Sequence, residues 1–370
     1  MKWSFRIGEV RGIEIRVHAT FALILIWAAL DWGATRGLTG ALYGVLQIGL
    51  LFACVTLHEL GHSLVARRYG VVVRNITLLP IGGVAHLEGE MSRPAQEFWM
   101  ALAGPAVNVA LAAIIAAAAL PLLGWRALGG LGVLWGHLSG LSVERLLVDL
   151  LAANLSLALF NLLPAFPMDG GRVLRALLAS RMGKLNGTRI AARVGQGLAV
   201  MLGLLGLFGG SFNLALIAGF IFIGAEQEWR GVQVKTALQQ VPASAALMRG
   251  GVMLSPTDLL ARAIDATLRS GQTDFAVFDG GYLVGVLTRE DVAQGFQRYG
   301  HHVPVERVMR TKFPVAQSSE TLLDLQRKMQ TSGNSAISIV EGGRFLGLAT
   351  LESVRNALRL FSTRRWRSAT

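Results

Sequence analysis

The chain has 370 residues, of which 52% are hydrophobic and only 16% are charged. Soluble domains usually carry about 25% charged residues, so this composition excludes a wholly soluble protein and favours a membrane protein. Lys and Arg outnumber Asp and Glu by 35 to 23, but the positive charges flank apolar segments and form no single basic face. They indicate a lipid bilayer surface, and no nucleic-acid partner is expected. The single cysteine, Cys54, excludes an intrachain disulfide.

Six apolar segments follow one another along the chain, and a helix of about 20 such residues crosses a bilayer. They cover residues 17–30, 38–66, 95–122, 146–167, 190–208 and 212–226. The last two share one uncharged run, in which FGGSFN (208–213) predicts a tight turn. No cleavable signal peptide is evident, so the first segment is expected to stay. The sequence therefore predicts a polytopic α-helical membrane domain over residues 17–230.

Lys and Arg predict the orientation of these segments, because cytoplasmic flanks are richer in both residues. An even number of spans puts both termini on one side of the membrane. The flanks on that side carry most of the Lys and Arg, including Arg67 and Arg68, whereas the opposite side holds Arg36, Arg126 and Arg145. We expect a multi-pass protein of the cell membrane with both termini in the cytoplasm. Residues 1–16 are then a cytoplasmic N-terminal segment.

The motif HELGH, residues 58–62, lies near the cytoplasmic end of the second segment. Residues four apart share a face of a helix, so His58 and His62 can bind one zinc ion, and Glu59 can act as general base. Ionisable residues at membrane depth are costly and usually functional. The alternative is two interfacial histidines and a glutamate at a helix end. The sequence favours zinc, with the active site near the cytoplasmic side.

A catalytic zinc takes three protein ligands, so a third one is needed. The expected orientation excludes Asp31 and Asp149. The remaining candidates are Glu88, Glu90, Glu97 and Asp169. Asp169 is favoured because the prolines and glycines around it, in NLLPAFPMDGGR (161–172), break the helix and free the backbone to turn a carboxylate inward. The alternative is an exposed aspartate in a turn.

Three motifs together resemble the site-2 protease family of intramembrane zinc metalloproteases. They are HELGH, GPAVN (104–108) in the third segment and NLLPAFPMDGG (161–171) in the fourth. The resemblance implies one Zn²⁺ per chain, with His58, His62 and Asp169 as metal ligands and Glu59 as the catalytic residue. It also implies that Asn108 and Asn161 position the substrate or stabilise an oxyanion. Interhelical hydrogen bonding is the alternative role for an asparagine in a span.

The resemblance also implies a substrate class. It predicts hydrolysis of a peptide bond within or near a transmembrane segment of a membrane-tethered protein, such as an anti-sigma factor or a sigma-factor precursor. Residues 71–92 alternate β-branched positions and contain Gly82-Gly83, which predicts short strands with a turn. Family members have a membrane-associated β-hairpin here, whose edge can pair with an extended substrate.

After Arg230 the sequence has the composition of a soluble α/β domain and contains a repeat. Met248 aligns with Met309, and Gly285 aligns with Gly347. The two copies resemble a pair of CBS domains. The expected parts are a linker (231–243), a first CBS domain (244–302), a second CBS domain (303–362) and a basic tail (363–370).

CBS pairs often bind adenine nucleotides, with a Thr-x-x-Asp sequence that contacts the ribose. The first copy has Thr288 and Asp291, whereas the second has Thr350 and Ser353 and lacks the acidic residue. The resemblance thus implies at most one complete nucleotide site. The alternative is a module for homodimerisation or docking.

Two other functions remain open from the sequence. One is a membrane transporter with a regulatory CBS pair, in which HELGH is an incidental metal site. The absence of paired inverted repeats counts against it. The other is a catalytically inactive scaffold, against which the intact His58, Glu59, His62 and Asp169 argue.

Overall fold

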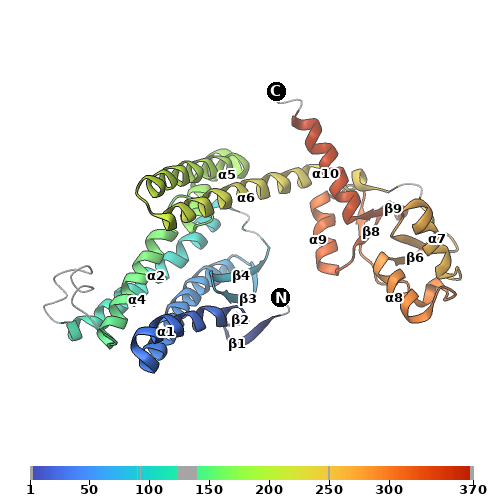
Figure 1. Cartoon of the computed structure of the whole chain (residues 1–370). Helices are drawn as coiled ribbons and strands as arrows, with labels where there is room; N and C mark the ends of the chain where they lie inside the picture. Colours follow the sequence, from blue (N-terminus) through green and yellow to red (C-terminus); the bar gives the residue numbers. More distant parts are fainter. Residues whose placement is uncertain (1–2, 90, 92, 124–139, 249–250, 367–370) are drawn as a thin grey trace. The chain divides into compact units, whose positions relative to one another are not determined.

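The computed structural model describes residues 3–89, 91, 93–123, 140–248 and 251–366. The chain divides into two compact units, Met1–Arg230 and Gly231–Thr370. The first unit consists of long helices and one small sheet, and the second alternates short helices and strands (Figure 1).

The helices described in the N-terminal unit are α1 (Phe21–Arg68), α2 (Pro94–Leu123), α4 (Val143–Asn161), α5 (Asp169–Phe208) and, as far as Arg230, α6 (Phe212–Gln240). Helix α1 reverses its direction at Gly37, whose φ of 64° and ψ of −152° are not helical. The two halves then lie against each other, with the ring centroids of Phe21 and Phe52 4.7 Å apart. A Cβ atom at Gly44 would lie 2.7 Å from the carbonyl oxygen of Ala28. Small residues thus permit the close approach that helices in membranes use.

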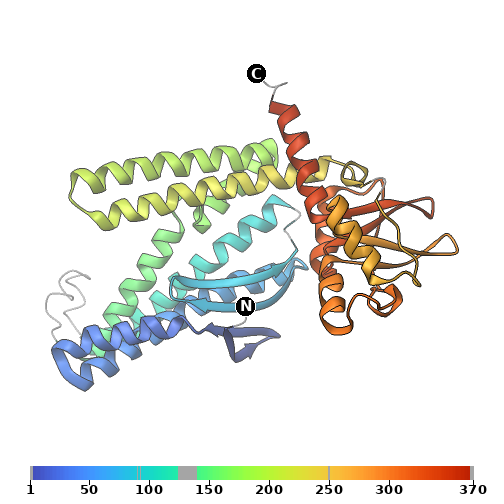
Figure 2. The ribbon, with the colours of Figure 1, turned by 45° about the vertical axis from the view of Figure 1, so that its right-hand side comes forward.

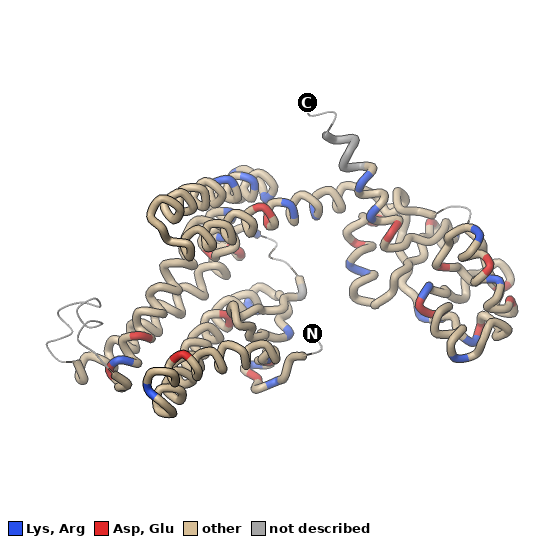
Figure 3. Tube along the Cα trace, in the orientation of Figure 1, with Lys and Arg blue, Asp and Glu red and all other residues tan. Residues whose placement is uncertain are grey.

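Three of the described helices, α1, α2 and α5, are long and apolar enough to cross a membrane by length and composition. Long stretches of α1, α2 and α4 carry no charged residue (Figure 3). However, α4 begins with Glu144 and Arg145 and contains Asp149, and α6 is charged from Glu226 onward. With these charges, α4 and α6 are not counted among the helices that could cross a membrane by length and composition. The membrane class is supported, and the count of six spans stays a prediction.

A four-stranded sheet accompanies the helices. It consists of β1 (Ser4–Val10), β2 (Ile13–His18), β3 (Val72–Leu79) and β4 (Gly82–Glu88), in the order β1-β2-β3-β4. Strands β2 and β3 are parallel, and the other two neighbouring pairs are antiparallel. The hairpin expected in residues 71–92 is present as β3 and β4, but its turn lies at Pro80 and Ile81, and both Gly82 and Gly83 belong to β4. Residues 1–16, expected only as a cytoplasmic segment, contribute β1 and part of β2.

The sheet packs against the C-terminal half of α1. Ile13 of β2 and Ile76 of β3 form one buried apolar cluster with Leu60 of α1 and Met100 of α2. Figure 2 shows the β3–β4 hairpin alongside α1. Because Leu60 lies inside HELGH, this packing holds strands next to the motif.

Both copies in the C-terminal unit contain a helix followed by two antiparallel strands. Among the described residues a leading strand, β7, is present only in the second copy, whereas in the first copy Leu254 forms an isolated bridge to Val277. The first copy has α7 (Leu260–Ser270), β5 (Phe275–Asp279), β6 (Tyr282–Leu287) and α8 (Arg289–Tyr299). The second has β7 (Val315–Gln317), α9 (Leu322–Ser332), β8 (Ala336–Glu341), β9 (Arg344–Thr350) and α10 (Leu351–Trp366). In both copies a Gly-Gly pair with positive φ joins the antiparallel strands, as a tight hairpin turn requires.

The segment that leads into each copy packs with the core of the other copy, although the expected bounds assigned Val303 and Val305 to the second CBS domain. Val303 and Val305 lie in the core of the first copy, and Val241 and Ala243 lie in the core of the second. Residues 231–240, expected in a linker, form the last part of α6. This exchange joins the two copies into one unit.

Candidate metal centre

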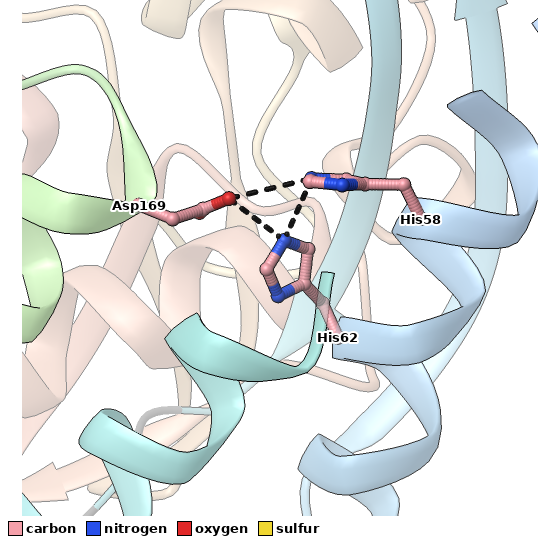
Figure 4. Close-up of side chains that lie close together, drawn as sticks. All are labelled: His58, His62 and Asp169. Carbon is pink, nitrogen blue, oxygen red and sulfur yellow. Dashed lines mark hydrogen bonds and ion pairs between the residues drawn. The ribbon is translucent and has the colours of Figure 1, made fainter. Parts of the chain in front are cut away.

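Two histidines and one aspartate converge at the contact between α1 and the start of α5. His58, His62 and Asp169 are buried. Nε2 of His62 lies 3.1 Å from Nε2 of His58 and 3.1 Å from Oδ2 of Asp169, and Nε2 of His58 lies 3.3 Å from the same oxygen. Figure 4 shows the three side chains pointing toward one another. Donor atoms about 2.0–2.1 Å from a tetrahedral zinc ion lie roughly 3.3 Å apart, so this spacing fits zinc.

The hydrogen bonds of His62 favour a cation between the three groups. Its Nδ1 lies 2.7 Å from the carbonyl oxygen of Met100. A carbonyl oxygen only accepts, so Nδ1 carries the proton and, in the neutral ring, Nε2 keeps a lone pair. This lone pair faces a carboxylate oxygen of Asp169, which also only accepts. Two such acceptors attract each other only through a second proton or a bound cation, and a backbone partner behind the ring is typical of metal-ligating histidines.

The segment before α5 determines where Asp169 lies. Residues 162–168 connect α4 to α5 and fold back on the first turn of α5. A Cβ atom at Gly170 would overlap the carbonyl oxygens of Leu162 and Leu163, and one at Gly171 would lie 2.6 Å from the backbone nitrogen of Phe166. Only glycine fits such a close backbone approach. The two glycines after Asp169 therefore permit the turn that brings its carboxylate inward.

Helix α2 passes directly beside the three ligand atoms. A Cβ atom at Gly104 would lie 2.6 Å from Nε2 of His58 and even closer to Nε2 of His62. One turn further on, Asn108 is 0% exposed. Neither polar atom of its amide has a hydrogen-bond partner in the described part of the chain. The GPAVN motif thus supplies both space for a metal and an unsatisfied amide on the same face of α2.

Glu59 lies next to His58 and is half-buried beneath β4. A Cβ atom at Gly83 would lie 2.6 Å from Cγ of Glu59. Asn161 is the last residue of α4 and is half-buried, and its side chain makes no hydrogen bond within the described ranges. Glu59 thus lies beside a metal ligand along α1, whereas no contact among the described residues places Asn161 near the ligands.

Comparison with known proteins shows the family of this chain. The model of peptidase family M50 matches residues 46–205, and the CBS domain model matches residues 305–360. A zinc metalloprotease of Methanocaldococcus jannaschii is 32% identical over 368 residues, which are 97% of each chain. The chain belongs to peptidase family M50. It is a zinc metalloprotease of the site-2 type with a CBS domain.

Two further proteins are similar to this chain. Stage IV sporulation protein FB of Bacillus subtilis is 27% identical over 221 residues, 59% of this chain and 67% of the relative. The solved structure of a site-2 protease from Methanocaldococcus jannaschii is 37% identical and covers 62% of this chain and 96% of that one, with a TM-score of 0.43.

The other acidic residues that the structure describes make different contacts. Glu97 forms a buried ion pair with Arg175 of α5. Asp149 accepts hydrogen bonds from Gln47 and Arg145, and Asp31 is exposed. Glu90 and the side chain of Glu88 lie outside the described residues.

Sequence reasoning missed two polar groups close to the centre of the protease. One is Arg175, whose only signal was a positive charge between apolar neighbours. The other is Asn154 of α4, which is 0% exposed and whose amide donates to the carbonyl oxygen of Leu150 and approaches Sγ of Cys54 at 3.4 Å. Asn154 lies outside the motif that distinguished Asn161, the other asparagine of the fourth segment.

The proposed ribose contacts in the CBS pair make local hydrogen bonds. Thr288 caps α8. The backbone nitrogen of Thr288 donates to Oδ2 of Asp291 at 3.0 Å, and the hydroxyl of Thr288 donates to the same oxygen at 2.6 Å. Nε of Arg310 also donates to Asp291, at 2.9 Å. In the second copy, Ser353 replaces the aspartate in the corresponding cap of Thr350. A ribose at Asp291 would therefore share the carboxylate with these donors.

Proposed function

We propose that this protease hydrolyses a peptide bond within or near a transmembrane segment of a membrane-tethered protein. The observation that carries the proposal is the buried triangle of donor atoms from His58, His62 and Asp169, with Glu59 beside it. The resemblance to the site-2 family adds the substrate class, namely proteins like anti-sigma factors or sigma-factor precursors.

Each residue has a separate task in this proposal. His58, His62 and Asp169 hold the metal. A bound zinc ion supplies a Lewis acid for the scissile carbonyl and makes a water molecule more acidic. Glu59 takes the proton of the attacking water and passes it to the leaving nitrogen. Asn108 donates its amide hydrogen to the oxygen on which negative charge develops.

Strand β4 is suited to hold an unwound substrate. A membrane helix satisfies its own backbone groups, so the bond to be cut must first leave the helix. β4 lies at the edge of the sheet and passes over Glu59 at Gly83. A strand added to this edge satisfies the exposed backbone groups and lies close to the general base. We assign substrate alignment to β4.

The same proposal includes a regulatory role for the CBS pair. It assigns an adenine nucleotide to Thr288 and Asp291, because the first copy alone combines the hydroxyl and the carboxylate. Homodimerisation through the CBS pair belongs to the proposal as an alternative way of regulation. The test of homodimerisation is the molecular mass of the detergent-solubilised protein. A dimer should have the mass of two chains.

The topology is also part of the proposal: six spans in the cell membrane, both termini in the cytoplasm and the active site near that side. Cys54 is the only cysteine, so Cys54→Ala gives a background for single-cysteine labelling. An impermeant maleimide applied to intact cells should label Arg36→Cys but not Phe5→Cys or Arg355→Cys. Labelling of Phe5→Cys would contradict the orientation.

The first experiment measures zinc content and substrate cleavage in wild type, Glu59→Gln and Asp169→Asn. We expect about one zinc per wild-type chain, from the three-ligand site. Glu59→Gln should keep the zinc and lose cleavage, whereas Asp169→Asn should lose both. Asp31→Asn is the control, because Asp31 is exposed and away from the centre. Wild type without zinc would favour a transporter or an inactive scaffold.

A further inference from the structure

A buried ion cluster joins three helices of the N-terminal unit. Nε of Arg175 in α5 donates to Oε1 of Glu97 in α2 at 2.7 Å, and its Nη1 donates to Oε1 of Glu228 in α6 at 2.7 Å. The side chains of Arg175 and Glu97 are each only 10% exposed, and that of Glu228 is 39% exposed. Taking charges out of water is costly, and replacing a buried ion pair by apolar residues of similar volume is often neutral or stabilising. Stability alone therefore does not account for this cluster.

The cluster also contacts the segment that places the third metal ligand. The guanidinium of Arg175 lies over the ring of Phe166, with 5.0 Å from Cζ to the ring centroid. Phe166 is 1% exposed and packs against Ala191 of α5 and Ala225 of α6. It precedes Asp169 by three residues. A cation over an aromatic face is an attractive contact, stronger when both groups are desolvated.

On its other side, the cluster holds the face of α2 that lies beside the histidines. Glu97, Met100 and Gly104 follow one another at helical spacing on this face. The carbonyl of Met100 orients His62, and Gly104 leaves space for both rings. The ion pair of Glu97 with Arg175 thus connects α2, which orients His62 and leaves space for both imidazoles, to α5, which begins with Asp169.

We propose that Arg175 is a positioning residue of the metal centre. Through Glu97, Glu228 and Phe166 it holds Asp169 of α5 at a fixed distance from His62, which α2 orients, and from His58 beside it. Its planar guanidinium suits this task, because its fixed donors reach two carboxylates while its face lies on a ring. The inference rests on the proposed function, since it requires a metal at His58, His62 and Asp169.

The test is the dissociation constant for zinc, measured with a competing chelator on the full chain in detergent. Arg175→Gln should raise this constant by about 10- to 100-fold, as loss of outer supports of metal ligands does elsewhere. Arg181→Gln is the matched control, because Arg181 is an exposed arginine on the same helix. A change of less than about twofold in Arg175→Gln would overturn the inference.

A second variant separates positioning from stability. Glu97→Gln combined with Arg175→Gln removes both buried charges and should recover much of the thermal stability lost in Arg175→Gln. The zinc affinity should stay low, because Phe166 and Glu228 still lack their partner. Recovery of zinc affinity together with stability would show a merely structural role. If Arg175→Gln does not fold, Arg175→Lys keeps the charge but loses the planar fork, and an unchanged affinity there overturns the inference.

Wild type and Asp169→Asn distinguish this inference from the proposed function. If wild type binds no zinc, the proposed function itself fails. The other outcome is that wild type binds zinc, Asp169→Asn loses the zinc and Arg175→Gln keeps it. In that case the proposed function stands and only the role of Arg175 fails.

Discussion

Gly104 of α2 faces Nε2 of His58 so closely that an added Cβ atom would lie 2.6 Å from it. This distance is far inside van der Waals contact, so a side chain at this position must displace the imidazoles. We predict that Gly104→Ala lowers the zinc content by at least about tenfold. Gly49→Ala is the control, because a Cβ at this glycine of α1 would meet nothing within 4 Å. A full complement of zinc in Gly104→Ala would contradict the placement of the metal.

Gly83 of β4 lies as close to Glu59, the proposed general base, as Gly104 does to His58. Its added Cβ would lie 2.6 Å from Cγ of Glu59. Gly83→Ala should therefore shift Glu59 or β4 and reduce kcat by about 10²-fold, the lower end of what a positioned general base contributes. The zinc content is the internal control, because it should not change. Loss of zinc together with activity would mean that β4 supports the ligands as well.

We predict that the variant Asn108→Leu differs from wild type in opposite ways in stability and in activity. A buried polar group without a partner costs about 1–3 kcal/mol, and both amide atoms of Asn108 lack one among the described residues. Asn108→Leu should therefore leave thermal stability unchanged or raise it. If the amide serves the developing oxyanion, kcat should fall by about 10²- to 10³-fold. Asn154→Leu, the control, should retain kcat, and equal loss in both variants would contradict the role.

The sequence predicted the part of the site that local geometry determines. The spacing of His58 and His62 places both on one face wherever the segment is helical, and the glycines after Asp169 signal an unusual turn. The contact of His62 with Met100 could not be predicted, because it uses a backbone carbonyl that any residue provides.

Contacts between segments far apart in the sequence could not be predicted, for a different reason. Arg175 lies 78 residues from Glu97 and 53 from Glu228, and no periodicity pairs charges over such separations. The alternating residues of β2 were a readable signal, but strand pairing between residues 13–18 and 72–79 depends on how α1 folds back at Gly37. The repeat predicted the CBS elements, whereas the exchange of Val241 and Val303 between copies is again a tertiary property.

Asp324 predicts a pH dependence of stability in the second CBS copy. Its Oδ2 accepts a hydrogen bond from the hydroxyl of Thr321 at 2.7 Å in the cap of α9. This bond is the main reason why the pKa of Asp324 is lowered. A lowered pKa in the folded state stabilises the fold above the ordinary value of about 3.9, and this contribution is lost as pH falls through the folded pKa. Hydrogen exchange of α9 should therefore differ between wild type and Asp324→Asn at neutral pH, and the difference should vanish in acid.

The caps of α8 and α9 together test the nucleotide site. Thr288 with Asp291 and Thr321 with Asp324 form the same reciprocal capping box, so Asp291→Asn and Asp324→Asn disturb their helices in a comparable way. Only Asp291 lies in the proposed ribose site. Asp291→Asn should weaken binding of an adenine nucleotide by about tenfold or more, because hydrogen bonds to a charged acceptor are lost. Asp324→Asn should leave the affinity unchanged. If both variants bind alike, Asp291 serves only the cap and its bond to Arg310, and the docking role of the CBS pair is favoured.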